Sequence, residues 1–218
     1  GLYVGGDYTP NNRAGAKVLY NKLLERKIDS NPFIIYKCPW CGAEMGPVEG
    51  RSREIKGFEV QRNPVKLLFR CSDPQCDFSS LENHLPIYIT DEDIYEAPTS
   101  LLIGTVDKFA QIVWKTEEVL RLFGRREGTA VRPPDLIIQD ELHLITGPLG
   151  SMVGLFETLI EQACSFKQND KEVKPKIIAS TATISRSGEQ VNALYARDKD
   201  KVSVFPVQIV EAGESFFA

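Results

Sequence analysis

Two pairs of cysteines are the feature that most restricts how this chain can fold. Two residues separate Cys38 from Cys41, and four separate Cys71 from Cys76. The first spacing is typical of a zinc knuckle, in which Gly42 permits the tight turn that brings backbone amides toward sulfur; the second is less regular. Thiolates at these spacings reach tetrahedral Zn²⁺ without backbone strain. The sequence therefore predicts one structural zinc ion held by all four cysteines.

The predicted zinc site limits its own chemistry. Four sulfur ligands leave no open coordination position, so the metal is expected to stabilise folding and not to act as a Lewis acid. Five cysteines in a chain without an export signal argue against a disulfide framework. The alternative is that the four are reduced structural cysteines without a metal. The fifth, Cys164, is expected to be a packed core thiol.

The chain changes character near Pro32 and again near Pro86. These points bracket residues 32–86 as an inserted, zinc-ribbon-like module and assign residues 1–31 and 87–218 to one main domain. With 218 residues, 42% of them hydrophobic, the chain can bury one sizeable core and a small appendage. No apolar run is long enough to cross a membrane, and no signal peptide is recognisable. A cytoplasmic location without membrane contact is expected.

Outside residues 32–86, short apolar runs alternate with sequence of helical period. The runs are expected to be strands, the last three of them buried, and they lie at 2–4, 101–104, 136–138 and 176–179. This alternation predicts an α/β fold with an open parallel sheet flanked by helices.

Helices and loops are expected between these strands. The helical stretches lie at about 12–27, 106–114, 149–166 and 187–195. Two polar stretches, at 115–134 and 167–174, are expected to be loops, and a final strand is expected after Val202.

Glycines follow the first of the four expected strands, and polar residues follow the other three. They are Gly5 and Gly6, then Thr105 with Asp107, then Asp140 and Glu141 with His143, and finally the segment 180–183 with Thr181 and Thr183. In open parallel sheets, ligands bind outside the carboxyl ends of the strands. These positions are therefore the candidate functional residues.

Asp140 and Glu141 have the chemistry that nucleotide hydrolysis needs. Adjacent carboxylates at a strand end point in different directions, so one can hold a cation while the other orients a water. Asp140 would bind Mg²⁺ through water, and Glu141 would position and deprotonate the water that attacks the γ-phosphate of ATP. The alternative is a pair of acids that favours the start of a helix, with His143 as an ordinary structural histidine.

Asp140-Glu141-Leu142-His143 and Thr181-Ala182-Thr183 resemble motifs II and III of superfamily-2 helicases of the DEAD/DEAH-box type, in that family's order. The resemblance implies a RecA-like motor domain. It also implies that Asp140 and Glu141 bind Mg²⁺ and catalyse hydrolysis, while His143, Thr181 and Thr183 couple hydrolysis to domain movement.

Two earlier stretches resemble the same family. Gly5-Gly6 resembles the glycine doublet that approaches the nucleic-acid backbone, and the segment 104–107 resembles motif Ib, whose threonine, here Thr105, contacts a phosphate. The alternatives are a plain turn at the glycines and a simple helix N-cap at Thr105.

A closer resemblance involves residues 139–150, Gln-Asp-Glu-Leu-His-Leu-Ile-Thr-Gly-Pro-Leu-Gly, and the closing Glu-Ser-Phe-Phe-Ala at 214–218. These look like the helicase subunit of the DISARM phage-defence system and its bacterial and archaeal relatives. This resemblance implies action on DNA and a partner subunit in a defence system.

The sequence departs from the helicase pattern in one respect. It contains no Gly-x-x-x-x-Gly-Lys-Ser/Thr loop to hold the β- and γ-phosphates. We expect that this loop and a second motor domain belong to the remainder of a longer polypeptide, and that this piece alone hydrolyses essentially no ATP.

The charge of the chain is a weaker indicator of nucleic-acid binding than the motifs are. The net charge of −4 and pI near 5.4 argue against a wholly basic surface, so any contact must be local. The most basic stretch is 51–70, which could touch a phosphate backbone or be a solvated hairpin face. Two functions follow from the sequence: part of an ATP-dependent helicase or translocase, or a non-catalytic zinc-stabilised module that binds DNA or protein.

Overall fold

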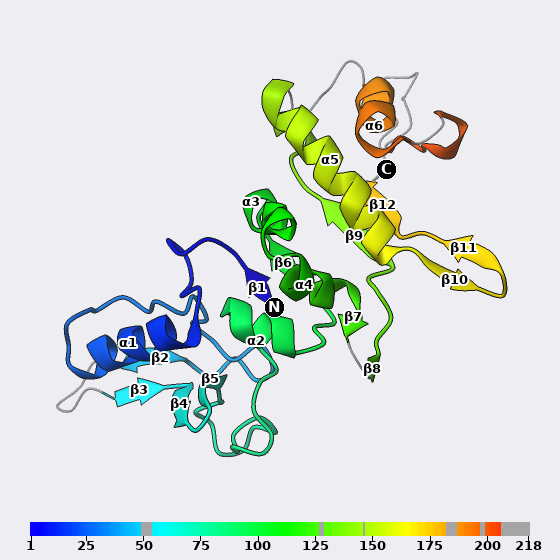
Figure 1. Cartoon of the computed structure of the whole chain (residues 1–218). Coiled ribbons are helices and arrows are strands. Elements are labelled where there is room, and N and C mark those ends of the chain that lie inside the picture. Colours follow the sequence, from blue (N-terminus) through cyan, green and yellow to red (C-terminus); the bar gives the residue numbers. More distant parts are fainter. Residues whose placement is uncertain (49–53, 127–128, 146, 182–186, 197–198, 206–218) are drawn as a thin grey trace, which may run out of the picture. The chain divides into compact units, whose positions relative to one another are not determined.

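The helices and strands divide between two units, Gly1–Val131 and Arg132–Ala218, each of which is considered by itself. The computed structural model describes residues 1–48, 54–126, 129–145, 147–181, 187–196 and 199–205 (Figure 1). Within these ranges the strands pair two by two, as two parallel pairs and four antiparallel hairpins. The mixed α/β class and the parallel pairing are confirmed. A single RecA-like open sheet stays a prediction.

The parallel pair of the first unit joins the N-terminus to the middle of the chain. Strand β1 (Leu2–Tyr3) pairs with β6 (Ile103–Gly104), with Tyr3 opposite Gly104. Tyr3 is fully buried, and its ring makes an edge contact with Phe109 at a centroid distance of 5.6 Å. A Cβ added to Gly104 would lie 2.8 Å from the Tyr3 carbonyl oxygen, so glycine is what allows the strands this close.

Helix α1 (Arg13–Leu24) begins where the sequence predicts and ends three residues before the expected Lys27. The Asn12 side chain accepts from the Gly15 amide at 2.7 Å, as an N-cap does. Arg13 ties α1 to helix α2 (Asp91–Glu96): its Nε lies 2.8 Å from Asp93, and its guanidinium lowers the pKa of Glu96 to about 2.

The cysteine-bearing segment forms two hairpins. Strand β2 (Gly46–Val48) pairs with β3 (Glu54–Lys56), and β4 (Phe58–Arg62) pairs with β5 (Val65–Phe69). Their core is continuous with α1: one buried cluster contains Ala16, Leu23, Phe33, Cys38, Met45, Phe58, Leu67, Phe69, Cys71, Cys76, Leu85 and Ile89. The boundaries 32–86 for a separate module stay a prediction, and the segment packs directly on the helix that precedes it.

Two expectations for the first unit need correction. The helix expected at 106–114 is a short α3 (Val106–Phe109) that tightens into a 3₁₀ turn, η1 (Ala110–Val113). The loop expected at 115–134 is instead largely regular, with helix α4 (Thr116–Leu120), turn η2 (Arg121–Phe123), and a hairpin of β7 (Arg125–Arg126) with β8 (Thr129–Ala130).

Burial explains why the second of these expectations failed. Val119 is fully buried and Phe123 is 5% exposed, although charged residues surround both in the sequence. Two apolar residues four positions apart lie on one face of a helix, and that face packs inward. The charged residues around Val119 and Phe123 made this four-residue spacing hard to recognise in the sequence.

The second unit contains the other parallel pair, β9 (Leu136–Gln139) and β12 (Lys176–Ala179), with Ala179 opposite Gln139. Helix α5 (Gly147–Cys164) packs on α6 (Ser187–Tyr195). Turn η3 (Leu142–Leu144) follows β9, and η4 (Lys199–Lys201) follows α6.

Three details of the second unit correct the predictions. The loop expected at 167–174 is a hairpin of β10 (Phe166–Gln168) and β11 (Lys171–Val173). Residues 202–205 form no strand, and the rest of the strand expected there lies outside the described residues. The strands β9 and β12 are not fully buried: Ile138 is 66% exposed and Ile178 46%. Side chains alternate across a strand, and among the described residues one face of this two-stranded sheet is more exposed than the other.

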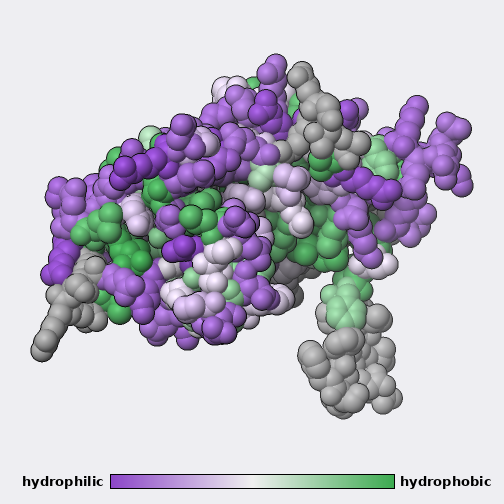
Figure 2. All heavy atoms as spheres, turned by 90° about the horizontal axis from the view of Figure 1, so that it is seen from below, coloured by the Kyte–Doolittle hydropathy of each residue, from purple (hydrophilic) through white to green (hydrophobic). Residues whose placement is uncertain are grey.

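The visible surface is mostly hydrophilic, with hydrophobic residues in separate patches between polar ones (Figure 2). Among the described helices, none combines the length and apolar character needed to span a membrane.

Candidate functional site

The four predicted cysteine ligands come together in one cluster. The sulfur atoms of Cys38, Cys41, Cys71 and Cys76 all lie within 4.8 Å of one another, and those of Cys41 and Cys71 are 3.4 Å apart. Four thiolates at the Zn–S distance of about 2.3 Å in a tetrahedron would be separated by about 3.8 Å. The cluster could therefore hold a metal ion, consistent with the structural zinc predicted from the sequence.

Backbone geometry builds the first knuckle. The Cys38 amide donates to the Ala43 carbonyl at 2.8 Å, and the Gly42 amide donates to the Cys38 carbonyl at 2.9 Å. Gly42 has φ of 79°, the left-handed conformation that glycine adopts without cost. The sequence prediction for Gly42 is confirmed.

The second knuckle closes in a similar way despite its longer spacing. The Cys71 amide donates to the Phe78 carbonyl at 2.9 Å, and the Asp73 amide points at the Cys71 sulfur at 3.4 Å. The Asp73 carboxylate accepts from the Gln75 amide at 2.9 Å and so stabilises the extra residues of the turn.

The electrostatics of the cluster favour a cation. Burial opposes ionisation of Cys38, but the amides of Cys41 and Trp40 donate to its sulfur, and the pKa of Cys38 falls below its ordinary value. Burial, together with the neighbouring sulfurs, raises the pKa of Cys71 to about 12. Four thiols this close cannot all ionise alone, and a divalent ion removes that obstacle by binding the thiolates.

Two aromatic residues join the knuckles, and the sequence reasoning assigned them no role. Trp40 lies inside the first knuckle and Phe78 just after the second, and their rings meet edge to face with centroids 5.5 Å apart. Trp40 is 65% exposed, so this contact joins the two knuckles without burying the indole. An aromatic residue within a Cys-x-x-Cys turn was the available sequence signal.

The predicted carboxylates lie beside the end of the next parallel strand. Since Gln139 is opposite Ala179, Asp140 follows β9 at the level where Ser180 follows β12. The Ser180 amide donates to the Gln139 carbonyl at 2.8 Å, and the Leu142 amide donates to the Ser180 carbonyl at 2.9 Å. The turn that carries Glu141 and His143 is thus fixed to the segment that carries Thr181.

Glu141 occupies a strained position in this turn. Its backbone has φ of 53° and ψ of 43°, a left-handed conformation that costs a non-glycine residue free energy and is concentrated at functional sites. The Asp140 carboxylate accepts from the Glu141 amide at 2.9 Å, and buried Leu142 anchors the turn. Both carboxylates remain exposed to solvent, where they are free to meet a ligand.

His143 lies next to the second carboxylate. Its Nδ1 is 3.2 Å from a carboxylate oxygen of Glu141, with the imidazole 34% and Glu141 57% exposed. Thr181 is exposed at the end of β12, and Thr183 lies outside the described residues. The structure therefore groups Asp140, Glu141 and His143 in one turn with Thr181 on the adjacent strand end.

Two side chains of helix α6 hydrogen-bond to the turn after β9 or to the strand before it. The sequence did not single out either of them. The Gln190 side-chain amide donates to the carbonyls of Leu142 at 3.1 Å and Ile145 at 3.0 Å. The Tyr195 hydroxyl donates to the side-chain oxygen of Gln139, and burial raises the pKa of Tyr195. Polar residues on an amphipathic helix gave no signal that distinguished them from solvent-facing ones.

The other predicted contacts, in the first unit, also share a strand edge. The Thr105 amide donates to the Tyr3 carbonyl at 3.2 Å, so Thr105 and the residues after β1 are neighbours. Gly5 begins a turn, because its carbonyl accepts from the Tyr8 amide at 2.9 Å, and a Cβ there would meet no atom within 4 Å. Thr105 occupies the N-cap of α3, but its side chain makes no capping hydrogen bond. Gly5, Gly6 and Thr105 as nucleic-acid contacts stay a prediction.

Comparison with known proteins identifies a protein of similar sequence. No family model matches the chain. The alignment with DISARM protein DrmA of Bacillus paralicheniformis extends over 212 residues and covers 84% of this chain but only 18% of that protein. At 33% identity over this length, the chain is similar to a DISARM protein, as residues 139–150 and 214–218 had indicated.

Proposed function

We propose that this chain is part of an ATP-dependent nucleic-acid helicase or translocase that acts on DNA in phage defence. The observation that carries the proposal is the turn after β9, where Asp140 and a strained Glu141 lie beside the end of β12. The similarity to DISARM protein DrmA supports the defence role. The proposal includes a RecA-like motor domain whose remaining parts, the phosphate loop and a second motor domain, belong to a longer polypeptide, together with a partner subunit of the defence system.

Each residue of the turn has a distinct task in this proposal. Asp140 would hold Mg²⁺ through water, and the ion would offset phosphate charge in the complete protein. Glu141 would orient a water and accept its proton. The His143 imidazole, which lies beside Glu141, would respond to this change of charge and, with Thr181 and Thr183, couple hydrolysis to domain movement. Gly5, Gly6 and Thr105 would contact the nucleic-acid backbone, and the zinc-bound cysteines would hold the hairpins in place.

The test is Glu141→Gln in the complete protein, with ATP hydrolysis measured with and without single-stranded DNA. Glutamine keeps the shape of the side chain but cannot accept the proton, so DNA-stimulated hydrolysis should fall by about 100-fold or more. Glu172→Gln, an exposed carboxylate on hairpin β10–β11, is the matched control and should hydrolyse ATP normally.

Undiminished hydrolysis by a folded Glu141→Gln protein would reject the assigned role. Absence of any ATP hydrolysis in the unaltered complete protein would favour the other candidate, a non-catalytic zinc-stabilised module that binds DNA or protein.

A further inference from the structure

One face of hairpin β4–β5 packs into the buried core, and the opposite face does not. Phe58 and Phe69 point into the buried cluster. Side chains alternate along each strand, so the cross-strand pairs Glu59 with Leu68 and Gln61 with Lys66 lie on the opposite face.

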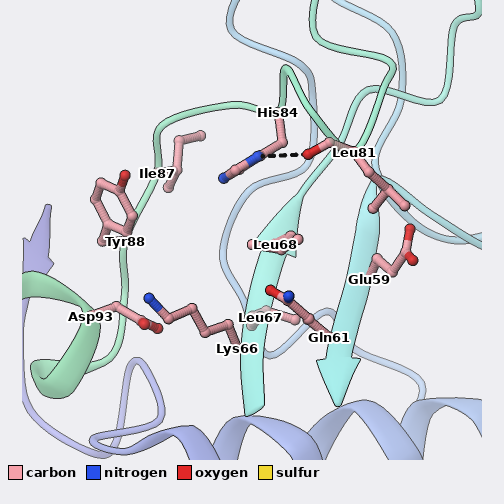
Figure 3. Close-up of a pocket in the computed structure, with 10 residues that line it drawn as sticks. All are labelled: Glu59, Gln61, Lys66, Leu67, Leu68, Leu81, His84, Ile87, Tyr88 and Asp93. Carbon is pink, nitrogen blue, oxygen red and sulfur yellow. Dashed lines mark hydrogen bonds between the residues drawn. The ribbon is translucent and has the colours of Figure 1, made fainter. Parts of the chain in front are cut away.

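The segment after the second knuckle lies over this face, and the two line an open cavity of about 410 Å³ (Figure 3). Leu81, His84, Ile87 and Tyr88 form its wall. This volume is within the range of about 300–1,000 Å³ that is usual for small-molecule sites. Apolar surface comes from both sides, with Leu68 on the hairpin and Ile87 on the wall.

The charged groups at the cavity are already neutralised. Lys66 Nζ lies 3.0 Å from Glu96, and the Asp93 carboxylate lies 2.8 Å from Arg13 and accepts from the Thr90 hydroxyl at 2.6 Å. Glu59, the third charged residue at the cavity, lies 3.5 Å from Arg70, so a small free ion would gain little here.

Neutral hydrogen-bonding groups, in contrast, remain free. Nδ1 of His84 lies 3.2 Å from the Leu81 carbonyl, which can only accept, so Nδ1 is the donor in this bond and Nε2 is not used by it (Figure 3). Among the described residues, the Gln61 side-chain amide and the Tyr88 hydroxyl have no hydrogen-bond partner. These groups offer donors and acceptors around an apolar slot.

We propose that this cavity binds one unstacked nucleobase of single-stranded nucleic acid. A base presents two flat apolar faces and an edge with both donors and acceptors, which matches leucine and isoleucine surfaces next to an amide, a hydroxyl and an imidazole nitrogen. The inference rests on the proposed function, which it deepens by assigning a base contact to the cysteine-bearing segment.

The experiment measures equilibrium binding of the complete protein, without ATP, to labelled single-stranded oligonucleotides of dA, dC, dG or dT of equal length. Leu68→Trp fills the cavity, and Gln61→Leu removes its amide at nearly constant size. Each should weaken binding about tenfold and reduce the preference among the four bases.

Gln168→Leu, an exposed glutamine on hairpin β10–β11, is the matched control and should bind normally. An oligonucleotide with a single 2-aminopurine gives a direct signal, because its emission rises when the base leaves the stack. Unchanged affinity and base preference in folded, zinc-containing Leu68→Trp and Gln61→Leu proteins would overturn the proposal. Since no ATP is present, this result is independent of hydrolysis by Glu141→Gln.

Discussion

The backbone amide of Leu142 donates a hydrogen bond of 2.9 Å to the carbonyl oxygen of Ser180. This bond joins the turn after β9 to the segment after β12, beyond the last paired residues of the two strands. Leu142 is buried, so the bond is shielded from water and holds the strained Glu141 between two fixed neighbours. The candidate carboxylates are therefore positioned by backbone contacts of the residue that follows them.

Gln190 is predicted to be a positioning residue for this turn. Gln190→Leu removes both hydrogen bonds to the turn carbonyls, and the free energy of unfolding of the chain should fall by about 1–2 kcal/mol. In the complete protein, kcat for ATP hydrolysis should fall while KM stays nearly constant. Gln162→Leu, on the exposed side of α5, should change neither quantity. Equal kinetics for the two variants would contradict this role.

Zinc removal should unfold the first unit. Its core includes three of the cysteines together with Ala16 and Leu23 of α1, so metal loss removes stabilisation on the order of 10 kcal/mol from a cluster that the helix shares. Elemental analysis should show about one zinc per chain in the unaltered protein and none in Cys71→Ser. Cys164→Ser alters a buried thiol whose pKa burial raises to about 12, and it should retain the metal. A folded Cys71→Ser protein without zinc would contradict the structural role.

A buried ion pair in the first unit should be costly to break. Lys108 is 4% exposed; its Nζ lies 2.7 Å from Asp91, 3.0 Å from Asn11 and 5.0 Å from the centre of the Tyr3 ring. Lys108→Met leaves the Asp91 carboxylate buried without a cation, so the free energy of unfolding should fall by about 3–5 kcal/mol. Chemical denaturation is the measurement.

Two comparison variants test the cause of that loss. Lys115→Met removes an exposed lysine and should change stability by less than about 0.5 kcal/mol. Adding Asp91→Asn to Lys108→Met should cost less than the sum of the two single changes, because the second removes the orphaned charge. Additive losses would show that the ion pair is not what stabilises this region.

Glu157 should make the second unit less stable as pH rises. Burial, with a contribution from Glu161, raises the pKa of Glu157 to about 7. The folded state therefore binds a proton more tightly than the unfolded chain, whose glutamate pKa is about 4.3, and this contribution to stability is lost as pH rises through about 7. Glu157→Gln, which mimics the protonated side chain, should raise the free energy of unfolding at pH 8 by about 1–3 kcal/mol. The same stability slope between pH 5 and 8 in both proteins would contradict the assignment.

Local patterns predicted the elements that depend on nearby residues. Cys38 and Cys41 with Gly42 specify a knuckle because residues within a stretch of five determine its turn. Asn12 marks the start of α1 because an N-cap acts over three residues. Apolar runs predicted β9 and β12. The polar residues that follow these strands predicted that Asp140 and Glu141 lie beside the segment after β12. Charge-rich sequence concealed α4, since its one buried residue, Val119, is outnumbered by exposed ones.

By itself, the sequence determined which residues can bind metal, which can act as acids or bases, and where α1, β9 and β12 begin. Only the tertiary structure decided that α1 shares its core with the cysteine hairpins, that Gln190 supports the Glu141 turn, and that a cavity lies between hairpin β4–β5 and residues 81–88. All three features depend on residues that are far apart in the sequence. Periodicity and spacing report interactions within a few residues, whereas these contacts join segments tens of residues apart, and they form only when burial of apolar surface selects one packing among many.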